Sequence, residues 1–412
     1  MTERGPAGMD VLVENGVVKE MKGQIPGSSA REVIDATKLL ILPGLIDCHV
    51  HFREPGLTHK GTMASEARSA RAGGVTTVCE MPNTSPACVT VAAFTEKVRL
   101  AKNVRDADIR FFFGITEKAH LAELKSLMTD PANAAIKSRC CGVKLYLDHS
   151  TGDQKVEGAI VDDVFNICAE LGLTLVAHCE DADMNAAAAD EFKNSTDVSD
   201  HSRMRPPESE AKSVAFAIER AKKFGTKFHV AHLSTSGALD HVRRAKKDGA
   251  TVTCEVAPHH LFLSTDDYPR LGAFGKMNPP LRSMEHVQAL WDGIRDGTVD
   301  CVSTDHAPHT FEEKQTENPL KAPSGVPGVE TMLPLLLTAI SPEQVVRLCF
   351  EHPNRIFGLG KRGITVGAPA DLVVVDPAAE GTIEAKQLHA KCGWTPFEGM
   401  PVTGKVMKVI TA

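Results

Sequence analysis

Short apolar runs alternate with longer amphipathic segments through the middle of the chain. Eight runs have the length and composition of strands, at residues 44–50, 75–81, 109–115, 142–147, 173–178, 227–232, 251–256 and 301–305. Between them apolar residues recur with a helical period, for instance at 63–72, 91–102, 161–171, 208–224 and 236–247. This rhythm predicts an α/β protein whose eight parallel strands close into a (β/α)8 TIM-type barrel. A doubly wound open sheet is the alternative, but it gives no reason for the polar residues described below.

The two ends of the chain have a different pattern. Residues 10–21 (DVLVENGVVKEM) alternate apolar and polar positions on either side of Asn15-Gly16, which is typical of a β-hairpin. Residues 370–376 and 404–410 also resemble strands, and no long helix is predicted between them. We therefore expect one small β domain built from both chain termini, with residues 1–42 and 359–412 in it and residues 43–358 in the barrel.

Composition and charge narrow the class of protein. The 412 residues are 42% hydrophobic and 24% charged, as in ordinary globular proteins. A net charge of −7 favours neither nucleic acid nor an anionic membrane as a partner. No apolar run approaches the roughly 18 residues that span a bilayer, and the start of the chain lacks a secretory signal pattern. The 11 cysteines, an odd number without a C-x-x-C motif, indicate free thiols in a reducing compartment, so we expect a cytoplasmic protein.

Residues that bind metals or move protons gather at the ends of the predicted strands. The first run ends in His49 and His51, and residues two apart on a strand point to the same side. The fifth and sixth runs end in His178 and His232, and the eighth ends in Asp305. Imidazoles and carboxylates suit zinc and its neighbours, and the carboxyl ends of barrel strands converge on one cleft. The set predicts a metal site, although each residue alone is compatible with a hydrogen-bonded core position.

Lys144 lies on the fourth predicted strand, in the sequence GVKLYL (residues 142–147). The four histidines and Asp305 are too few ligands for two metals that share a bridge, and such a bridge needs an anionic oxygen donor between the ions. A lysine ammonium only donates hydrogen bonds, but addition of CO2 to the neutral amine gives a carbamate that can span two cations about 3.5–4 Å apart. Pairing of Lys144 with a nearby acid such as Asp148 is the simpler interpretation, and the residues alone favour it.

Several segments together resemble a known family. They are residues 47–56 (DCHVHFREPG), 81–84 (MPNT), 144–146 (KLY), 254–260 (CEVAPHH), 303–309 (STDHAPH) and 394–399 (WTPFEG). From about residue 40 to the end, in this order, they resemble the dihydroorotases of the amidohydrolase superfamily. The resemblance implies a barrel with a terminal β domain and a CO2-derived carbamate on Lys144 that bridges two Zn²⁺ ions per chain. It also implies which residues bind these ions: His49, His51, Lys144, His178, His232 and Asp305.

The activity implied by the resemblance is the reversible cyclisation of N-carbamoyl-L-aspartate to L-dihydroorotate in de novo pyrimidine biosynthesis. In the hydrolytic direction a metal-activated hydroxide attacks the ring amide, and Asp305 takes its proton and passes it to the leaving ring nitrogen. The resemblance assigns the substrate carboxylate to Arg53, with Asn83, Asn278 and His309 as further contacts. Without the resemblance, a structural role in turns beside proline explains Asn83 and Asn278 equally well.

The chain departs from some members of this family at two places. The loop at residues 148–153 (DHSTGD) follows Lys144, where some relatives have a mobile loop that closes with a Thr-Phe pair, and Ser150-Thr151 stands here instead. Some relatives also bind a further metal through a cysteine and a glutamate. This chain has Ala231 and Glu255 at those positions, so we expect two metals, with Glu255 supporting a ligand.

Other functions are weighed against the resemblance. Dihydropyrimidinases, hydantoinases and allantoinases have the same metal cage, but their substrates do not demand the same carboxylate clamp, and allantoinases usually have asparagine at the position of Arg53. A catalytically silent scaffold would be expected to lack metal ligands, and every predicted ligand is present here. The resemblance also suggests a homodimer and an association with aspartate transcarbamoylase, as in several relatives.

Overall fold

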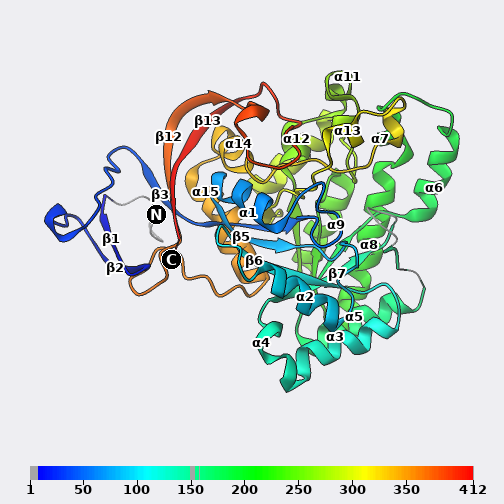
Figure 1. Ribbon diagram of the computed structural model, residues 1–412. Coiled ribbons are helices and arrows are strands. Elements are labelled where there is room, and N and C mark those ends of the chain that lie inside the picture. The colour runs from blue at the N-terminus through cyan, green and yellow to red at the C-terminus, as the bar shows by residue number, and fades with distance from the viewer. Residues whose placement is uncertain (1–7, 149–153, 157, 412) are drawn as a thin grey trace.

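The centre of the protein is a barrel of eight parallel strands (Figure 1). The computed structural model describes residues 8–148, 154–156 and 158–411, so the predicted loop is outside it except for Asp148. The strands neighbour one another in chain order: β4 (Leu45–Val50), β5 (Val75–Glu80), β6 (Asp108–Gly114), β7 (Cys140–Tyr146), β8 (Thr174–His178), β9 (Lys227–Val230), β10 (Val252–Val256) and β11 (Cys301–Val302). Beyond the end of β11, the His51 amide donates to the His306 carbonyl at 2.7 Å and joins the two edge strands. The predicted barrel is confirmed, and the open sheet is wrong.

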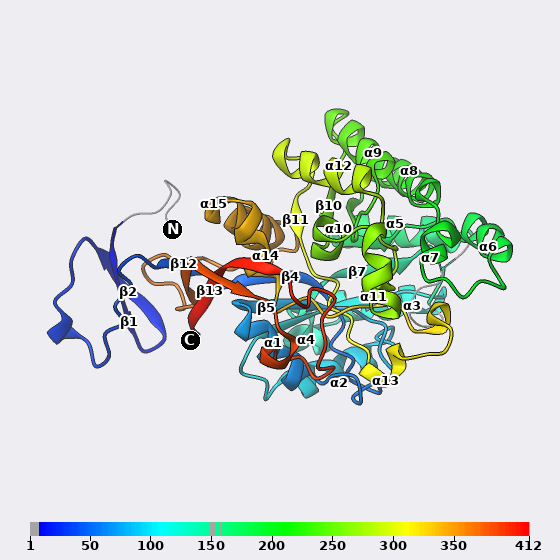
Figure 2. The same ribbon diagram turned by 90° about the horizontal axis from the view of Figure 1, so that it is seen from above.

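Strands of the barrel are apolar because both of their faces are covered. Every residue of β4, β5 and β8 is buried, which explains why these strands are apolar runs rather than alternating ones. Helices cover the outside of the barrel (Figure 2). The longer ones are α1 (Met63–Ala72), α2 (Val91–Ala101), α3 (Ala119–Thr129), α5 (Ile160–Leu171), α6 (Ala182–Glu191), α8 (Pro207–Phe224), α9 (Ser236–Lys247), α12 (Met284–Arg295) and α14 (Met332–Ala339). The shorter ones are α4 (Ala134–Lys137), α7 (Asp200–Met204), α10 (Pro258–Phe262), α11 (Tyr268–Leu271), α13 (Phe311–Lys314), α15 (Pro342–Val346) and α16 (His352–Ile356).

The predicted helices agree with the structure to within one residue at their ends, because local signals set where they begin. Thr62, Thr90 and Thr235 stand just before α1, α2 and α9, and each side chain accepts a hydrogen bond from a backbone N–H of the first turn. At their other ends, α5 and α8 stop at Gly172 and Gly225, which adopt the left-handed conformation that glycine allows.

The terminal β structure consists of two sheets. The predicted hairpin is confirmed as β1 (Asp10–Glu14) and β2 (Val17–Lys22), with positive φ at both Asn15 and Gly16. It is a separate two-stranded sheet that projects away from the barrel (Figures 1 and 2). Backbone hydrogen bonds of Gly16 and Val18, and packing of Val18 against Ala370 and Leu372, join it to the segment before β12. The second sheet contains β3 (Leu40–Pro43), β12 (Leu372–Thr382) and β13 (Pro401–Ile410), all antiparallel. Strand β3 was not predicted, because its apolar run continues almost without a break into β4.

A single residue, Gly44, separates β3 of the terminal sheet from β4 of the barrel. Its amide donates to the Asp371 carbonyl at 2.8 Å. A Cβ atom at this position would lie 2.1 Å from Thr76 Oγ1 and 2.3 Å from Asp371 Oδ1, so no side chain larger than hydrogen fits. The terminal sheet therefore continues directly into the strand that carries His49.

The segment between β12 and β13 returns to the barrel. Trp394 and Phe397 pack with Met277 and Leu281 in a second core cluster, and the Trp394 indole N–H donates to the His309 carbonyl at 2.7 Å. The WTPFEG segment thus supports the region of a predicted substrate contact. All eleven cysteines are free, and ten are buried. Among the helices that the structure describes, none is long and apolar enough to cross a membrane.

Candidate active site

The residues predicted as metal ligands come together at the carboxyl ends of the barrel strands. Five of the six line one pocket, with about 330 Å³ of free space that includes solvent at its mouth. The lining residues are His49, His51, Lys144, Tyr146, His232, Asn278, Asp305, Ala307, Ser324 and Gly325. The sixth, His178, is the last residue of β8 and contacts His232 from behind.

One half of the site contains His49, His51 and Asp305. Asp305 Oδ1 is 3.3 Å from His49 Nε2 and 2.9 Å from His51 Nε2. The three side chains are a group whose ligand atoms all lie within 4.8 Å of one another. Two imidazoles and a carboxylate at these distances form the type of donor set that divalent zinc prefers.

The other half of the site contains His178 and His232. His178 Nδ1 is 3.1 Å from His232 Nε2. Two nitrogens bound to one tetrahedral zinc at about 2.0–2.1 Å stand about 3.3 Å apart, so this separation fits two ligands of one metal. The ring of His232 also lies 5.1 Å from the ring of His49, which makes the two halves adjacent.

Lys144 lines the same pocket with a buried and unpartnered amine. Its Nζ atom has no hydrogen-bond partner among the described residues. Asp148, the acid in the simpler interpretation, instead accepts hydrogen bonds from Arg205 and Asn185, each at 2.7 Å, so that pairing is wrong. Burial lowers the pKa of the Lys144 amine to about 8. An amine with this pKa is partly neutral at pH 7, whereas an ordinary lysine is almost fully protonated, so it suits the CO2 addition considered above.

Backbone turns place several of these side chains. Arg53, His232 and Asp305 have φ values of 67°, 31° and 48°, three of the five positive values found at non-glycine residues in the described part of the chain. Because the backbone turns there, β9 and β11 end at Val230 and Val302, short of the predicted ends at residues 232 and 305. Non-glycine residues rarely adopt this left-handed conformation, because it costs conformational energy. The residues that do adopt it cluster at functional sites.

Three of the four histidines have a polar partner on the nitrogen that faces away from the other ligands. His49 Nδ1 contacts Glu255, and His51 Nδ1 lies 2.6 Å from Asn83 Oδ1. His178 Nε2 lies 2.8 Å from Glu180 Oε2. A partner of this kind fixes the tautomer and the orientation of a ligand ring. Asn83, predicted to contact the substrate, therefore holds His51 in this structure. Glu180 was not predicted, and the only sequence signal for it is its spacing of two from His178.

A cationic group lies behind the wall of the pocket. Arg53 is only 2% exposed, donates from Nε to the Pro308 carbonyl at 3.0 Å, and has no ion pair with a carboxylate among the described residues. Burial lowers its pKa to about 10, which leaves it charged at neutral pH. Its terminal nitrogen is 3.2 Å from His309 Nε2, which donates to the Ser324 carbonyl at 3.0 Å. Lys60, which was not predicted, donates to His309 Nδ1 at 3.1 Å.

The four predicted substrate contacts thus occupy two different positions. Asn278 lines the pocket and accepts a hydrogen bond from His201 Nε2 at 3.0 Å. Asn83 and His309 instead contact the lining residues His51 and Ser324, and Arg53 lies one contact further back, behind His309. Of the four, only Asn278 lines the pocket.

Comparison with known proteins places this chain in a family. The model of the amidohydrolase family matches residues 40–412, and the chain belongs to that family. A protein of Halobacterium salinarum named dihydroorotase is 44% identical over 365 residues, which cover 87% of this chain and 82% of that protein. A protein of Methanosarcina acetivorans with the same name is 38% identical, over 95% of this chain and 85% of that protein.

Solved structures resemble the chain over nearly all of its length. An L-hydantoinase (dihydropyrimidinase) from Arthrobacter aurescens superposes with a TM-score of 0.91 at 28% identity, covering 98% of this chain and 91% of that chain. A dihydropyrimidinase from Brevibacillus agri gives a TM-score of 0.89 at 25% identity, covering 98% and 90%. The family and these relatives define the protein as a cyclic amide hydrolase.

Proposed function

We propose that the protein is a dihydroorotase, which interconverts N-carbamoyl-L-aspartate and L-dihydroorotate in pyrimidine biosynthesis. The observation that carries this proposal is Arg53, a buried guanidinium that has no carboxylate partner among the described residues and lies beside the pocket. A buried charge without a counter-ion is costly, and a substrate carboxylate would supply the missing partner. The relatives named dihydroorotase, at 33–44% identity, favour the same substrate.

The side chains around the pocket fit two zinc ions. His49, His51 and Asp305 would hold one ion, and His178 and His232 the other. The orphaned amine of Lys144 fits a bridge: its lone pair forms a bond to the carbon of CO2, and the nitrogen releases one proton. Bound there, the ions would activate the attacking water and polarise the amide carbonyl.

Asp305 would move the proton during the reaction. Burial favours the neutral acid, but the nearby His49 and His51 hold the pKa of Asp305 well below its usual range. The carboxylate is therefore ionised and can accept a proton from the attacking water. It then delivers this proton to the ring nitrogen that leaves, and ring closure follows the same path in reverse.

The pocket wall would position the substrate. Asn278 offers a side-chain amide at the lining, and Arg53 supplies positive charge from behind Ser324. A Cβ atom at Gly325 would lie 2.7 Å from the Ala307 carbonyl oxygen and 3.0 Å from His309 Nε2, so a side chain would have no room there. Glycine at this position lets the backbone of the pocket wall pack closely against Ala307 and His309.

A substrate panel tests the proposed function. We expect the zinc-loaded protein to hydrolyse L-dihydroorotate at least about 100-fold more efficiently than hydantoin or allantoin, because only dihydroorotate has the carboxylate that satisfies Arg53. Ultraviolet absorbance follows ring opening for each compound. Hydrolysis of hydantoin or allantoin alone would make the protein a ureide hydrolase. Failure to hydrolyse any of the three, with zinc bound, would favour a silent scaffold.

The proposed carbamate predicts a pH dependence for activation of the metal-free protein. Only the neutral amine adds CO2, and its fraction falls about tenfold for each pH unit below the pKa of Lys144, about 8. We therefore expect activity to return faster at about pH 8.5 than at about pH 6.5 when zinc is added at a fixed concentration of dissolved CO2. Samples are withdrawn at intervals after zinc is added, and their activity is assayed at one common pH to give the time course of recovery. A recovery rate that depends on neither pH nor CO2 contradicts the carbamate.

The cellular compartment and the partners of the protein belong to the same proposal. Free cysteines throughout the chain favour a reducing compartment, and we propose the cytoplasm. A homodimer and an association with aspartate transcarbamoylase stay predictions from the resemblance.

A further inference from the structure

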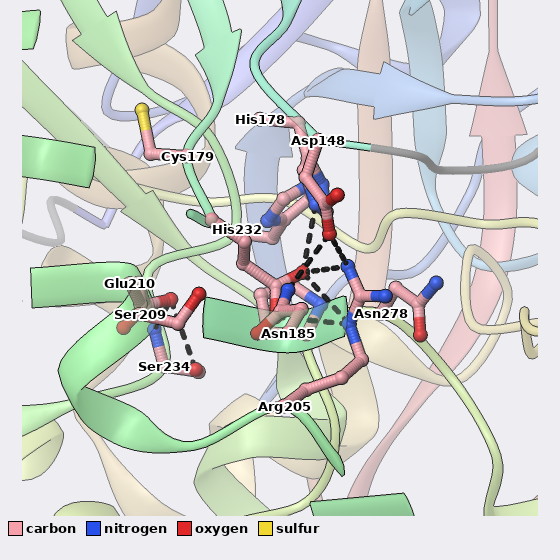
Figure 3. Close-up of polar contacts among 12 residues, drawn as sticks. Asp148, His178, Cys179, Asn185, Arg205, Ser209, Glu210, His232, Ser234 and Asn278 are labelled. Atoms are coloured by element: carbon pink, nitrogen blue, oxygen red, sulfur yellow. Dashed lines mark hydrogen bonds and ion pairs between the residues drawn. The ribbon is translucent and has the colours of Figure 1, made fainter. Parts of the chain in front are cut away.

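A buried network of charges joins His178 to the end of β7 (Figure 3). Glu180 is fully buried, and its Oε2 atom accepts a hydrogen bond from His178 Nε2 at 2.8 Å. Arg205 donates from Nε to both oxygens of Glu180, at 3.0 and 3.1 Å. Its NH2 nitrogen lies 2.5 Å from Glu180 Oε2 and 2.7 Å from Asp148 Oδ2. Asn185 donates to the same Asp148 oxygen at 2.7 Å.

The network determines which nitrogen of His178 faces the site. A carboxylate accepts hydrogen bonds, so Nε2 of His178 carries the proton next to Glu180. The lone pair is then on Nδ1, the atom that lies 3.1 Å from His232 Nε2. Without Glu180, the ring would be free to rotate or to change its tautomer, and the nitrogen pair would no longer be fixed.

We propose that Glu180 is the positioning residue for the second metal and that Arg205 ties it to β7, the strand that bears Lys144. This inference rests on the proposed function, since it assumes that His178 and His232 bind a zinc ion. Asp148 stands four residues after Lys144. The Asp148–Arg205–Glu180 chain therefore connects the strand of the bridging lysine to a ligand of the metal that it bridges.

The two halves of the site differ in the support of their histidines. Glu255 contacts His49 and accepts a hydrogen bond from His229 Nε2 at 3.1 Å. Glu180, by contrast, shares its negative charge with the guanidinium of Arg205. A carboxylate already neutralised by a cation polarises its histidine less, so His178 is a weaker donor than His49. The metal bound by His178 and His232 is therefore the first to leave when a chelator is added.

Glu210 provides a matched control within the same region (Figure 3). It is as buried as Glu180, at 1% exposure, and accepts hydrogen bonds from the amide and the hydroxyl of Ser234, each at 2.9 Å. Among the described residues it has no hydrogen bond to a predicted metal ligand. Glu210→Gln thus removes a buried carboxyl group without touching His178, whereas Glu180→Gln removes the carboxylate that holds it.

The experiment compares zinc binding by the wild-type protein, Glu180→Gln and Glu210→Gln. Zinc per chain is measured by atomic spectrometry, and release is followed with a chromogenic chelator. We expect two zinc ions in the wild type and in Glu210→Gln. In Glu180→Gln one of the two should bind about 10- to 100-fold more weakly, with the other unchanged. The absorption spectrum of the cobalt-loaded variant should lose the contribution of one site only.

Several outcomes would overturn the inference. A folded Glu180→Gln that holds both metals like the wild type, or that loses both to the same extent, shows that Glu180 does not position the second metal. If this variant does not fold, Glu180→Asp decides: it keeps a carboxylate for Arg205 but is one methylene too short for His178, and normal metal binding would count against the proposal. A wild type without zinc contradicts the proposed function itself, whereas two zinc ions with an unaffected Glu180→Gln contradict only the positioning role.

Discussion

Lys144→Ala is expected to lower kcat by about 1,000-fold or more and to reduce the metal content of the protein. The bridge between two cations contributes several kcal/mol to catalysis, and each 1.36 kcal/mol corresponds to a factor of ten in rate. The neighbouring side chains offer no substitute, because Asp148 is held by Arg205 and Asn185. Turnover with dihydroorotate and zinc per chain are the two measurements.

Two controls separate loss of the bridge from loss of the fold. Lys144→Met keeps the bulk of the side chain but cannot form a carbamate, so it should be as inactive as the alanine variant while its thermal unfolding stays close to that of the wild type. Acetate or formate added to Lys144→Ala should restore part of the activity, since a small carboxylate can enter the vacated space. Unchanged turnover in either variant would refute the carbamate.

Arg53→Met is expected to raise KM for dihydroorotate about 10- to 150-fold while both metals stay bound. A hydrogen-bonded charge on the substrate carboxylate contributes about 1.5–3 kcal/mol, and this contribution appears in KM when it acts on substrate and transition state alike. Arg53 also holds the Pro308 carbonyl, so part of the effect comes through the position of His309. Steady-state kinetics and zinc analysis of the same preparation provide the test.

Arg53→Lys distinguishes charge from geometry. A lysine keeps the positive charge but lacks the planar fork of donors, so we expect a KM between those of the wild type and the methionine variant. Hydantoin, which has no carboxylate, should react with similar efficiency in all three proteins. Loss of metal in Arg53→Met, or an equal effect on hydantoin, would mean that Arg53 supports the site instead of binding the carboxylate.

The residues proposed as metal ligands stand out in the sequence because, apart from Lys144 within β7, each lies at or near the end of a recognisable strand. A parallel barrel buries both faces of its strands, so the strands are apolar runs, and a histidine or aspartate at the end of such a run is conspicuous. His49, His178 and Asp305 were singled out in this way, and the structure places His49 and Asp305 in one pocket with His178 against the lining residue His232. The bends at His232 and Asp305 were not predicted, because positive φ values at these residues leave no signal in the composition of the runs.

Of the supporting contacts, Glu255 was predicted and does contact His49, but the others could not be predicted, for a different reason. Glu180 and Arg205 are 25 residues apart, and Arg205 belongs to none of the motifs that carry the family resemblance. Asn83 was assigned to the substrate because its motif suggested it, yet its oxygen lies 2.6 Å from a ring nitrogen of His51. Such partners depend on how separate loops meet above the barrel, and hydrophobic periodicity contains no information about that. The split of the terminal strands into two sheets has the same origin.

The junction at Gly44 has a consequence for where the chain tolerates change. Strand β12 pairs with both β3 and β13, and Arg71 of α1 donates to the Val409 carbonyl of β13 at 2.9 Å. Trimming the chain within β13, or fusing another protein there, would disturb β12 and, through it, β3. Because only one residue separates β3 from β4, the displacement would pass on to His49. The tip of the β1–β2 hairpin is no safer a place, because the Ala370 amide, just before β12, donates to the Gly16 carbonyl at 2.7 Å, and Val18 packs against Ala370 and Leu372. Fusion partners and affinity tags therefore belong away from both β13 and the Asn15-Gly16 turn.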